Sequence, residues 1–126
     1  MAAPKDLKFT KTHEWVKFLG VGTALVGFSD YAQDALGDLV FINAPSQGDS
    51  VTAGKPLGDI ESVKAVSDIY SPVSGIVVEI NEDVVDDPAK INADPYGSWI
   101  VKIAGITERD GLLDAEAYDR LCEEEA

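Results

Sequence analysis

The sequence contains one cysteine, Cys122, and one histidine, His13, among its 126 residues. A single cysteine can form neither an internal disulfide nor a multi-cysteine metal site, so we expect neither. A single histidine leaves little material for a Ser/His/Asp catalytic set, and no Gly-rich phosphate-binding loop is present. We therefore expect no catalytic site within the chain itself, and any redox chemistry must come from an attached group.

We interpret both solitary residues as structural. Cys122 stands in the terminal LCEEEA, where acidic neighbours oppose formation of a thiolate. His13 lies two residues before Trp15, in a context typical of a packing or hydrogen-bonding histidine. Neither residue is expected to act on a substrate.

Basic residues are also scarce: ten lysines and arginines stand against 23 aspartates and glutamates, which makes the net charge −13. Such a surface repels phosphate, which excludes nucleic acid as a partner and disfavours docking on anionic membranes. No run of residues is long and apolar enough to span a bilayer. We expect a soluble monomer whose partners present basic surfaces.

Length and composition predict one domain over residues 1–126. A chain of this length, with 45% hydrophobic residues, can build a single core. The N-terminal MAAPKDLKF lacks the apolar segment of a leader peptide. We therefore expect a cytoplasmic protein, or one of the mitochondrial matrix if a presequence has been removed.

The segment GDIESVKAVSDIYSPVSG is nearly symmetric about Lys64. Residues 57–62 and 65–70 carry β-branched or aromatic side chains, and glycine and proline stand outside them, which is typical of two short antiparallel strands. The pattern places Lys64 at the tip of a hairpin, although the turn contains no Asn-Gly or Asp-Gly. The residues alone leave two interpretations open: a solvated surface charge, or an amine presented for acylation.

A weak internal repeat predicts that the β-structure folds back on itself. Residues 37–43 read GDLVFIN and residues 75–81 read GIVVEIN, so that glycine, apolar residues and asparagine recur in step. Each copy leads through a turn-rich stretch into a further expected strand, near residues 57–61 and 99–103. Two such units can face each other as a sandwich or flattened barrel.

Three short helices are expected. Ser29-Asp30 can cap a helix over residues 31–36 that stops at Gly37, and Asp87-Pro88 can start a second, with proline at its first position. Asp114 is the N-cap candidate of a terminal helix, whose apolar face would hold Ala117, Tyr118, Leu121 and Cys122. Four aromatic residues are expected to pack in the core or at sheet edges: Trp15, Phe41, Tyr70 and Trp99.

The word ESVKAVSDIYSPVSG resembles the lipoyl-attachment hairpin of the H proteins of the glycine cleavage system. Further H-protein-like segments follow the expected order: THEWV at 12–16, DYAQDALGDLVF at 30–41, DPYG at 94–97 and LLDAEAY at 112–118. The sequence departs from the family pattern at Leu19 and Val21, where polar residues are usual, and in a shortened PYGSW. The resemblance covers nearly the whole chain and implies a mainly β, lipoyl/biotinyl-type barrel-sandwich hybrid with a few short helices, including a C-terminal one.

The resemblance also implies a function. Lys64 would carry lipoate as an amide and shuttle an aminomethyl group from a pyridoxal-phosphate-dependent glycine decarboxylase to a tetrahydrofolate-dependent aminomethyltransferase. Dihydrolipoamide dehydrogenase would then receive the electrons, and a lipoate ligase or lipoyltransferase would attach the cofactor. In this interpretation Glu14 receives the amine of the loaded arm, whereas Glu61 and Asp68, which bracket Lys64, are recognised by the lipoylating enzyme.

Four alternatives stand beside this interpretation. A lipoyl domain of a 2-oxoacid dehydrogenase usually presents Asp-Lys-Ala, and here valine precedes the lysine. A biotin carrier favours methionines around its lysine, and this chain has only Met1. An H-like protein that relays lipoyl groups in lipoate metabolism could have the same hairpin. An unmodified β-domain that binds partners would show no lipoylation at all.

Overall fold

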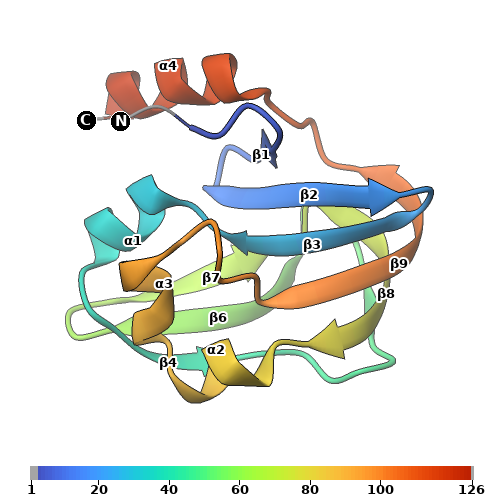
Figure 1. Ribbon diagram of the computed structural model, residues 1–126, viewed down its shortest axis with the longest axis horizontal. Coiled ribbons are helices and arrows are strands. Elements are labelled where there is room, and N and C mark those ends of the chain that lie inside the picture. Colours follow the sequence, from blue (N-terminus) through green and yellow to red (C-terminus); the bar gives the residue numbers. More distant parts are fainter. Residues whose placement is uncertain (1–2, 126) are drawn as a thin grey trace.

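The computed structural model describes residues 3–125 as two facing β-sheets with four short helices (Figure 1). The strands are β1 (Lys8–Phe9), β2 (Glu14–Gly20), β3 (Thr23–Phe28), β4 (Leu39–Asn43), β5 (Ser50–Val51), β6 (Pro56–Ser62), β7 (Val66–Tyr70), β8 (Val73–Ile80) and β9 (Val101–Arg109). The helices are α1 (Asp30–Leu36), α2 (Glu82–Asp86), α3 (Ala89–Ala93) and α4 (Ala115–Glu125). The expectation of a mainly β fold with a C-terminal helix is confirmed.

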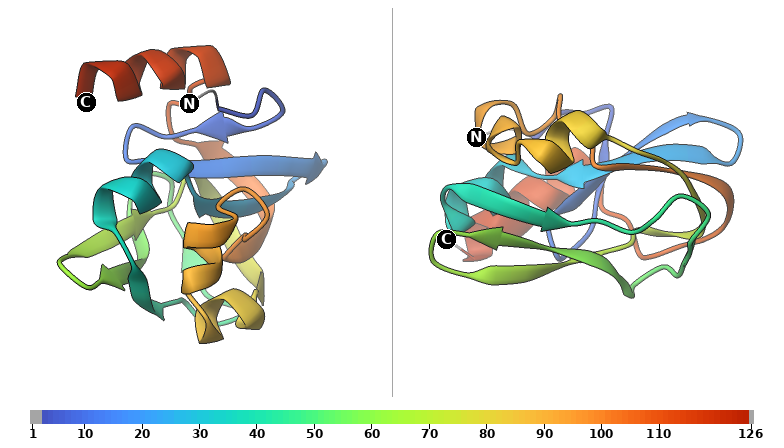
Figure 2. Two further views of the ribbon diagram at one scale, coloured as in Figure 1. Left: turned by 60° about the vertical axis from the view of Figure 1, so that its left-hand side comes forward. Right: turned by 90° about the horizontal axis from the view of Figure 1, so that it is seen from below.

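The larger sheet has the order β1-β2-β3-β9-β8-β5 and the smaller one the order β4-β6-β7, with antiparallel pairing throughout. The sheets pack face to face across an apolar layer (Figure 2). Ile42, Ile60 and Ile69 enter this layer from the smaller sheet, and strand alternation turns their neighbours outward. The larger sheet contributes buried residues such as Val26, Val77 and Ile103.

The two copies of the sequence repeat become β4 and β8, which lie in different sheets as the repeat predicted. The strand expected at residues 57–61 is β6. The strand expected from residue 99 begins two residues later, at Val101, and continues to Arg109. Before it, Ile100 is already buried and its N–H donates to the carbonyl of Val26, so the chain joins the core before the regular ladder starts.

Two helices begin where the sequence predicted. The Ser29 hydroxyl accepts a hydrogen bond from Ala32 N at 3.2 Å and caps α1, which ends at Gly37 with φ 83°. The Asp114 carboxylate accepts from Ala117 N at 2.8 Å at the start of α4. Local side-chain capping therefore decides both boundaries.

The prediction for Asp87-Pro88 is wrong in detail. Pro88 occupies the cap position of α3 rather than its first helical position, and no side chain caps that helix. The short helix α2 was not predicted, because EDVVD is brief and its two valines favour strands over helices. Burial of Val84 in the core holds this single turn in place.

Phe41 lies at a sheet edge, on β4 of the smaller sheet, which is one of the two positions expected for it. Its side chain is 54% exposed, because the neighbouring Ile42 takes the core-facing position on β4 and turns Phe41 to the outer face of the smaller sheet. Trp15 is buried as expected, and Tyr70 and Trp99 are half-buried. Phe41 therefore belongs to the surface beside the hairpin and not to the core.

Helix α4 lies across the outer side of β1 and β2 (Figure 1). Tyr118 is buried there, and its ring stacks on Phe9 with 4.3 Å between centroids. The Tyr118 hydroxyl hydrogen-bonds to Ser29 Oγ at 2.6 Å and to His13 Nδ1 at 2.7 Å, which ties α4 to the start of α1. Within residues 3–125, no helix has the length and apolar character required to cross a membrane.

Candidate functional site

Lys64 stands in the turn between β6 and β7, as the sequence predicted. Ser62 closes the turn: its N–H donates to the Ala65 carbonyl at 2.8 Å, and its hydroxyl accepts from the N–H groups of Lys64 at 3.2 Å and Ala65 at 3.1 Å. This side chain supplies the turn chemistry that an Asn-Gly pair would otherwise provide. The signal in the sequence was a serine two residues before the lysine.

The Lys64 side chain is exposed, and its ammonium group forms no ion pair among the residues that the structure describes. The neighbouring valines are exposed as well, Val63 by 69% and Val66 by 65%. An unpaired amine on a hydrogen-bonded turn is accessible to an enzyme and costs no buried contact when it is acylated. The turn therefore suits covalent attachment of a carboxylic acid.

Glu61 and Asp68 lie on the outer face of the smaller sheet. Glu61 is half-buried between Phe41 and Val66 on the adjacent strands, and Asp68 is exposed opposite Asp59. Neither carboxylate contacts Lys64 through a hydrogen bond or an ion pair in the described part of the chain. Both remain free to meet a cationic partner that approaches the hairpin.

Glu14 lies elsewhere, at the start of β2, and is completely buried. Its Oε1 accepts hydrogen bonds from the hydroxyls of Thr10, at 2.6 Å, and Thr12. Its Oε2 accepts from Tyr70 N, at 3.3 Å, so the carboxyl group links the larger sheet to the end of β7. Burial raises the pKa of Glu14 to about 7, although the hydrogen bonds oppose this shift.

The structure therefore separates the predicted site residues. Tyr70, whose N–H donates to Glu14, lies at the end of β7, six positions after Lys64. For an extended chain, this separation between Lys64 and Tyr70 corresponds to about 20 Å. Sequence reasoning identified Glu14 but missed its donors. Thr10 and Thr12 reach the carboxylate through a tight turn, in which His13 N donates to the Thr10 carbonyl at 3.2 Å and Thr10 N donates to the Glu14 carbonyl at 3.0 Å. Strand alternation does not apply within a turn, so no periodic pattern in the sequence signalled these donors.

His13, beside Glu14, is confirmed as a hydrogen-bonding residue. Its Nδ1 bonds to the Tyr118 hydroxyl, its Nε2 lies 3.2 Å from a Glu125 carboxylate oxygen, and its ring stacks on Tyr31. The backbone φ of 75° is rare for a residue with a side chain. His13 thus shapes the loop that presents Glu14. Cys122 is half-buried on α4, and burial raises its thiol pKa.

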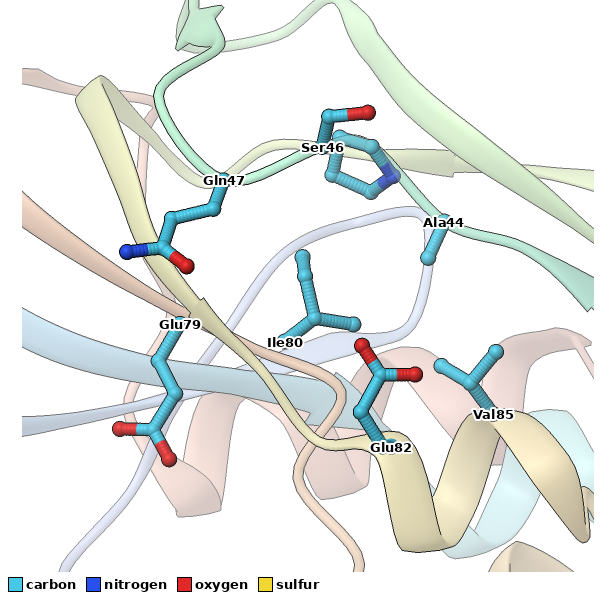
Figure 3. A pocket seen from close by; sticks show the side chains of 8 residues that line it. Ala44, Ser46, Gln47, Glu79, Ile80, Glu82 and Val85 are labelled. Carbon is cyan, nitrogen blue, oxygen red and sulfur yellow. The ribbon is translucent and has the colours of Figure 1, made fainter.

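A separate pocket of about 530 Å³ lies near the end of β4 that is remote from Lys64 (Figure 3). Its carboxylates are Glu79, which pairs with Lys102 at 3.2 Å, and Glu82 on α2. No group of three or more His, Cys, Asp or Glu within residues 3–125 is arranged to hold a metal ion.

Comparison with known proteins places these features in a family. The family model described as glycine cleavage H-protein matches residues 7–125. The glycine cleavage system H protein of Lachnoclostridium phytofermentans is 51% identical over 125 residues, which cover 99% of this chain and 98% of that protein. The one from Carboxydothermus hydrogenoformans is 50% identical, with 97% and 95% covered. A crystal structure of a glycine cleavage system H protein from Mycobacterium marinum superimposes with a TM-score of 0.89 at 41% identity, covering 94% of this chain and 97% of that one.

We expect Glu14→Gln to change how stability depends on pH. The pKa of Glu14 is about 7 in the folded protein, above its ordinary 4.5, so the folded state binds this proton more tightly than the unfolded chain does. The resulting stabilisation is complete below pH 4.5 and is lost as pH rises through 7. The free energy of unfolding of the wild type, relative to the variant, should fall by about 3 kcal/mol between pH 4.5 and pH 8.

Urea unfolding at both pH values measures this difference. Glu108→Gln is the matched control, because Glu108 is an exposed strand carboxylate and should give a nearly constant difference. A pH-independent difference for Glu14→Gln would show that the carboxyl group does not titrate in this range.

Proposed function

The chain belongs to the glycine cleavage H-protein family, the lipoyl carriers of the glycine cleavage system, and from this premise we propose that Lys64 is its lipoyl-attachment residue. The exposed, unpaired position of Lys64 at the hairpin tip is the observation that carries the proposal. A lipoyl amide there would replace the cation with a long apolar arm.

The bound lipoyl group would supply a cyclic disulfide able to accept an aminomethyl group and two electrons together. Under this proposal the protein carries the aminomethyl group from a pyridoxal-phosphate-dependent glycine decarboxylase to a tetrahydrofolate-dependent aminomethyltransferase, and the electrons to dihydrolipoamide dehydrogenase. A lipoate ligase or lipoyltransferase would load it. The chain's own residues hold the arm, orient it and limit access of water.

The reach of the arm limits what the chain can do with it. About ten bonds of roughly 1.5 Å span on the order of 12–14 Å from the backbone to the dithiolane ring. This length lets the ring enter the cleft of a docked enzyme. Even the extended arm is shorter than the distance of about 20 Å to Tyr70, so contact between its load and Glu14 also requires the hairpin to move toward β2.

We propose that Glu14 receives the amine of the loaded arm. A carboxylate can pair with the cationic aminomethyl group, and a buried position excludes the water that would hydrolyse it. Because Glu14 has no exposed surface, this role requires Thr10–Thr12 to move aside and let the amine replace their hydroxyl donors. With a pKa of about 7 in the unloaded protein, Glu14 carries the negative charge that pairs with the amine most fully above neutral pH.

We propose that Glu61 and Asp68 are read by the lipoylating enzyme. Both face outward on the strands that flank Lys64, and neither is paired with a cation among residues 3–125. A basic surface on the enzyme would bind them and guide its active site to the turn. We further propose that the carrier is a monomer and, since the relatives named above are bacterial, that it works in the cytoplasm.

Incubation with a lipoate ligase, lipoate and ATP should add one lipoyl group to the wild type, and Lys64→Arg should abolish the addition completely. Intact mass and the mass of the Lys64 peptide measure the product. Lys55→Arg, which changes another exposed lysine in a loop, should be modified like the wild type. Absence of modification under conditions that lipoylate a known acceptor would remove the basis of the proposal.

The same lipoylated protein separates glycine cleavage from a lipoyl relay. A glycine-cleavage carrier should support glycine-dependent release of carbon dioxide by a glycine decarboxylase. A relay would instead pass its lipoyl group to a second acceptor protein in the presence of a lipoyltransferase, without supporting decarboxylation.

Glu61→Ala and Asp68→Ala should each lower kcat/KM for lipoylation by about threefold to tenfold, because a charge at the rim of an interface mainly changes the rate of encounter. Initial rates at several acceptor concentrations give this value. Asp83→Ala removes an exposed carboxylate on α2 and serves as the control for net charge. Wild-type rates for both variants would contradict the recognition role.

Glu14→Gln should speed hydrolysis of the loaded carrier by about tenfold at pH 8, since a neutral amide cannot pair with the amine. At pH 6 more of the wild-type carboxyl is protonated, so the difference in hydrolysis rate between wild type and variant should be smaller than at pH 8. Release of ammonia from isolated loaded carrier measures both. Equal rates at pH 8 would disprove the protective role, and Glu108→Gln controls for the lost charge.

A further inference from the structure

The turn that carries Lys64 is hydrogen-bonded to the junction between α1 and β4, residues 37–38. The N–H of Val63 donates to the Asp38 carbonyl at 3.0 Å. The Lys64 side chain runs past Gly37, because a Cβ built on this glycine would lie 3.7 Å from Lys64 Cε. Figures 1 and 2 both show the β6–β7 turn beside the end of α1. The orientation of the lysine therefore depends on a second segment, 25 to 27 positions earlier in the chain.

The junction has an unusual backbone conformation. Gly37 has φ 83° and ψ −157°, a region open almost only to glycine, and its N–H closes α1 by donating to the Gln33 carbonyl at 2.9 Å. Glycine permits this conformation but does not enforce it, because its backbone is the most flexible of all residues. Contacts from another part of the protein must therefore hold the α1–β4 junction in this conformation.

Asn92, a half-buried residue on α3, makes the contacts that hold the junction. Its Nδ2 donates to Gln33 Oε1 at 2.9 Å and to the Gly37 carbonyl at 3.0 Å, and its Oδ1 accepts from Leu39 N at 3.0 Å. The two backbone bonds fall on either side of Asp38, whose carbonyl receives the Val63 N–H. The Leu39 N–H belongs to the same peptide unit as the Asp38 carbonyl, and the Gly37 carbonyl belongs to the unit before it. One side chain thus fixes the peptide unit that carries the docking carbonyl together with the preceding one.

Packing and a hydrogen bond fix helix α3, which carries Asn92. Ile91, next to Asn92, is completely buried in the core between the sheets. The Ser98 hydroxyl donates to the Lys90 carbonyl at 3.0 Å and ties the helix to the chain before β9. A continuous path of buried and hydrogen-bonded groups therefore runs from the core through Asn92 to the Lys64 turn.

We infer that Asn92 is a positioning residue for the Lys64 turn. It holds Gly37 to Leu39 so that the Asp38 carbonyl captures Val63 N and the lysine leaves the turn in one direction. Without it, the Gly37 carbonyl and the Leu39 N–H lose their partner, the glycine is free to rotate, and the turn separates from α1. The step from this geometry to cofactor attachment rests on the function proposed above; the geometric role itself does not.

Amide hydrogen exchange at Val63, observed by NMR, tests the inference directly on the unmodified protein. Asn92→Ala should raise the exchange rate of the Val63 amide by about tenfold, because loss of the junction's hydrogen bonds favours local opening. Asn81→Ala is the matched control: Asn81 is also half-buried and donates to a backbone carbonyl, that of Trp99, at 2.8 Å, but lies away from the hairpin. An unchanged Val63 rate in Asn92→Ala would overturn the inference.

A second variant distinguishes local opening of the turn from general destabilisation of the fold. Asn92→Asp keeps the acceptor for Leu39 N and the side-chain volume but loses both donors. It should speed Val63 exchange by about threefold to tenfold while core amides such as Val77 keep wild-type rates. Equal acceleration of core and turn amides in both variants would show a purely structural residue and would also overturn the inference.

Lipoylation kinetics give the functional consequence. With a lipoate ligase, lipoate and ATP, Asn92→Asp should raise the KM for the acceptor by about threefold to tenfold and leave kcat nearly unchanged, because the lysine is present but presented in more directions. Asn81→Ala should match the wild type. If the wild type is not lipoylated at all, the proposed function fails while Val63 exchange still decides the role of Asn92.

Discussion

Burial of the apolar layer between the two sheets is the constraint on which the rest of this structure depends. Ile60 on β6 and Ile69 on β7 must both face that layer, and because side chains alternate along a strand, this requirement sets the register of the hairpin. A slip of either strand by one residue would turn its isoleucine to the outer face. The same register leaves the turn, and with it Lys64, outside the core. Core burial thus determines which residue the hairpin presents.

The fold combines a network of contacts around α4 and α1 with an exposed hairpin tip. Helix α4 is fixed by the stacking of Tyr118 on Phe9 and by the chain of hydrogen bonds from His13 through Tyr118 to Ser29. These contacts join the two ends of the sequence to the start of α1. Because α1 ends at the junction that receives the Lys64 turn, this network of contacts extends to the hairpin tip. Under the proposed function, it would present the lysine in the same orientation to each partner.

Carboxyl groups occupy two contrasting environments in this molecule, an exposed sheet face and a buried site. The outer face of the smaller sheet combines the exposed Phe41 and Val66 with carboxylates that have no cationic partner in the described chain, so it can offer both apolar contact and charge to a basic enzyme. Glu14 is the opposite case, a carboxyl group taken out of water and held by hydroxyl donors. Desolvation brings its pKa near neutrality, where a cation could change its charge state.

The sequence alone determined the features that arise from neighbouring residues. Alternation and symmetry located the hairpin and its lysine, and Ser29, Gly37 and Asp114 marked helix boundaries through local capping. Local patterns failed where the partner was distant: they did not predict α2, whose stability comes from burial of Val84, and they did not decide whether Phe41, at a sheet edge, faces the core or the solvent.

Only the tertiary structure decided how distant groups meet. The Glu14 carboxylate accepts from Tyr70 N across 56 positions, Asn92 binds the Gly37 carbonyl across 55, and His13 meets Tyr118 across 105. Propensity and periodicity act over a few residues, whereas these hydrogen bonds require strands from different parts of the chain to be paired and the two sheets to be packed first. For this reason the hairpin and the place of Lys64 at its tip could be predicted from the sequence, and the contacts that hold this turn in place could not.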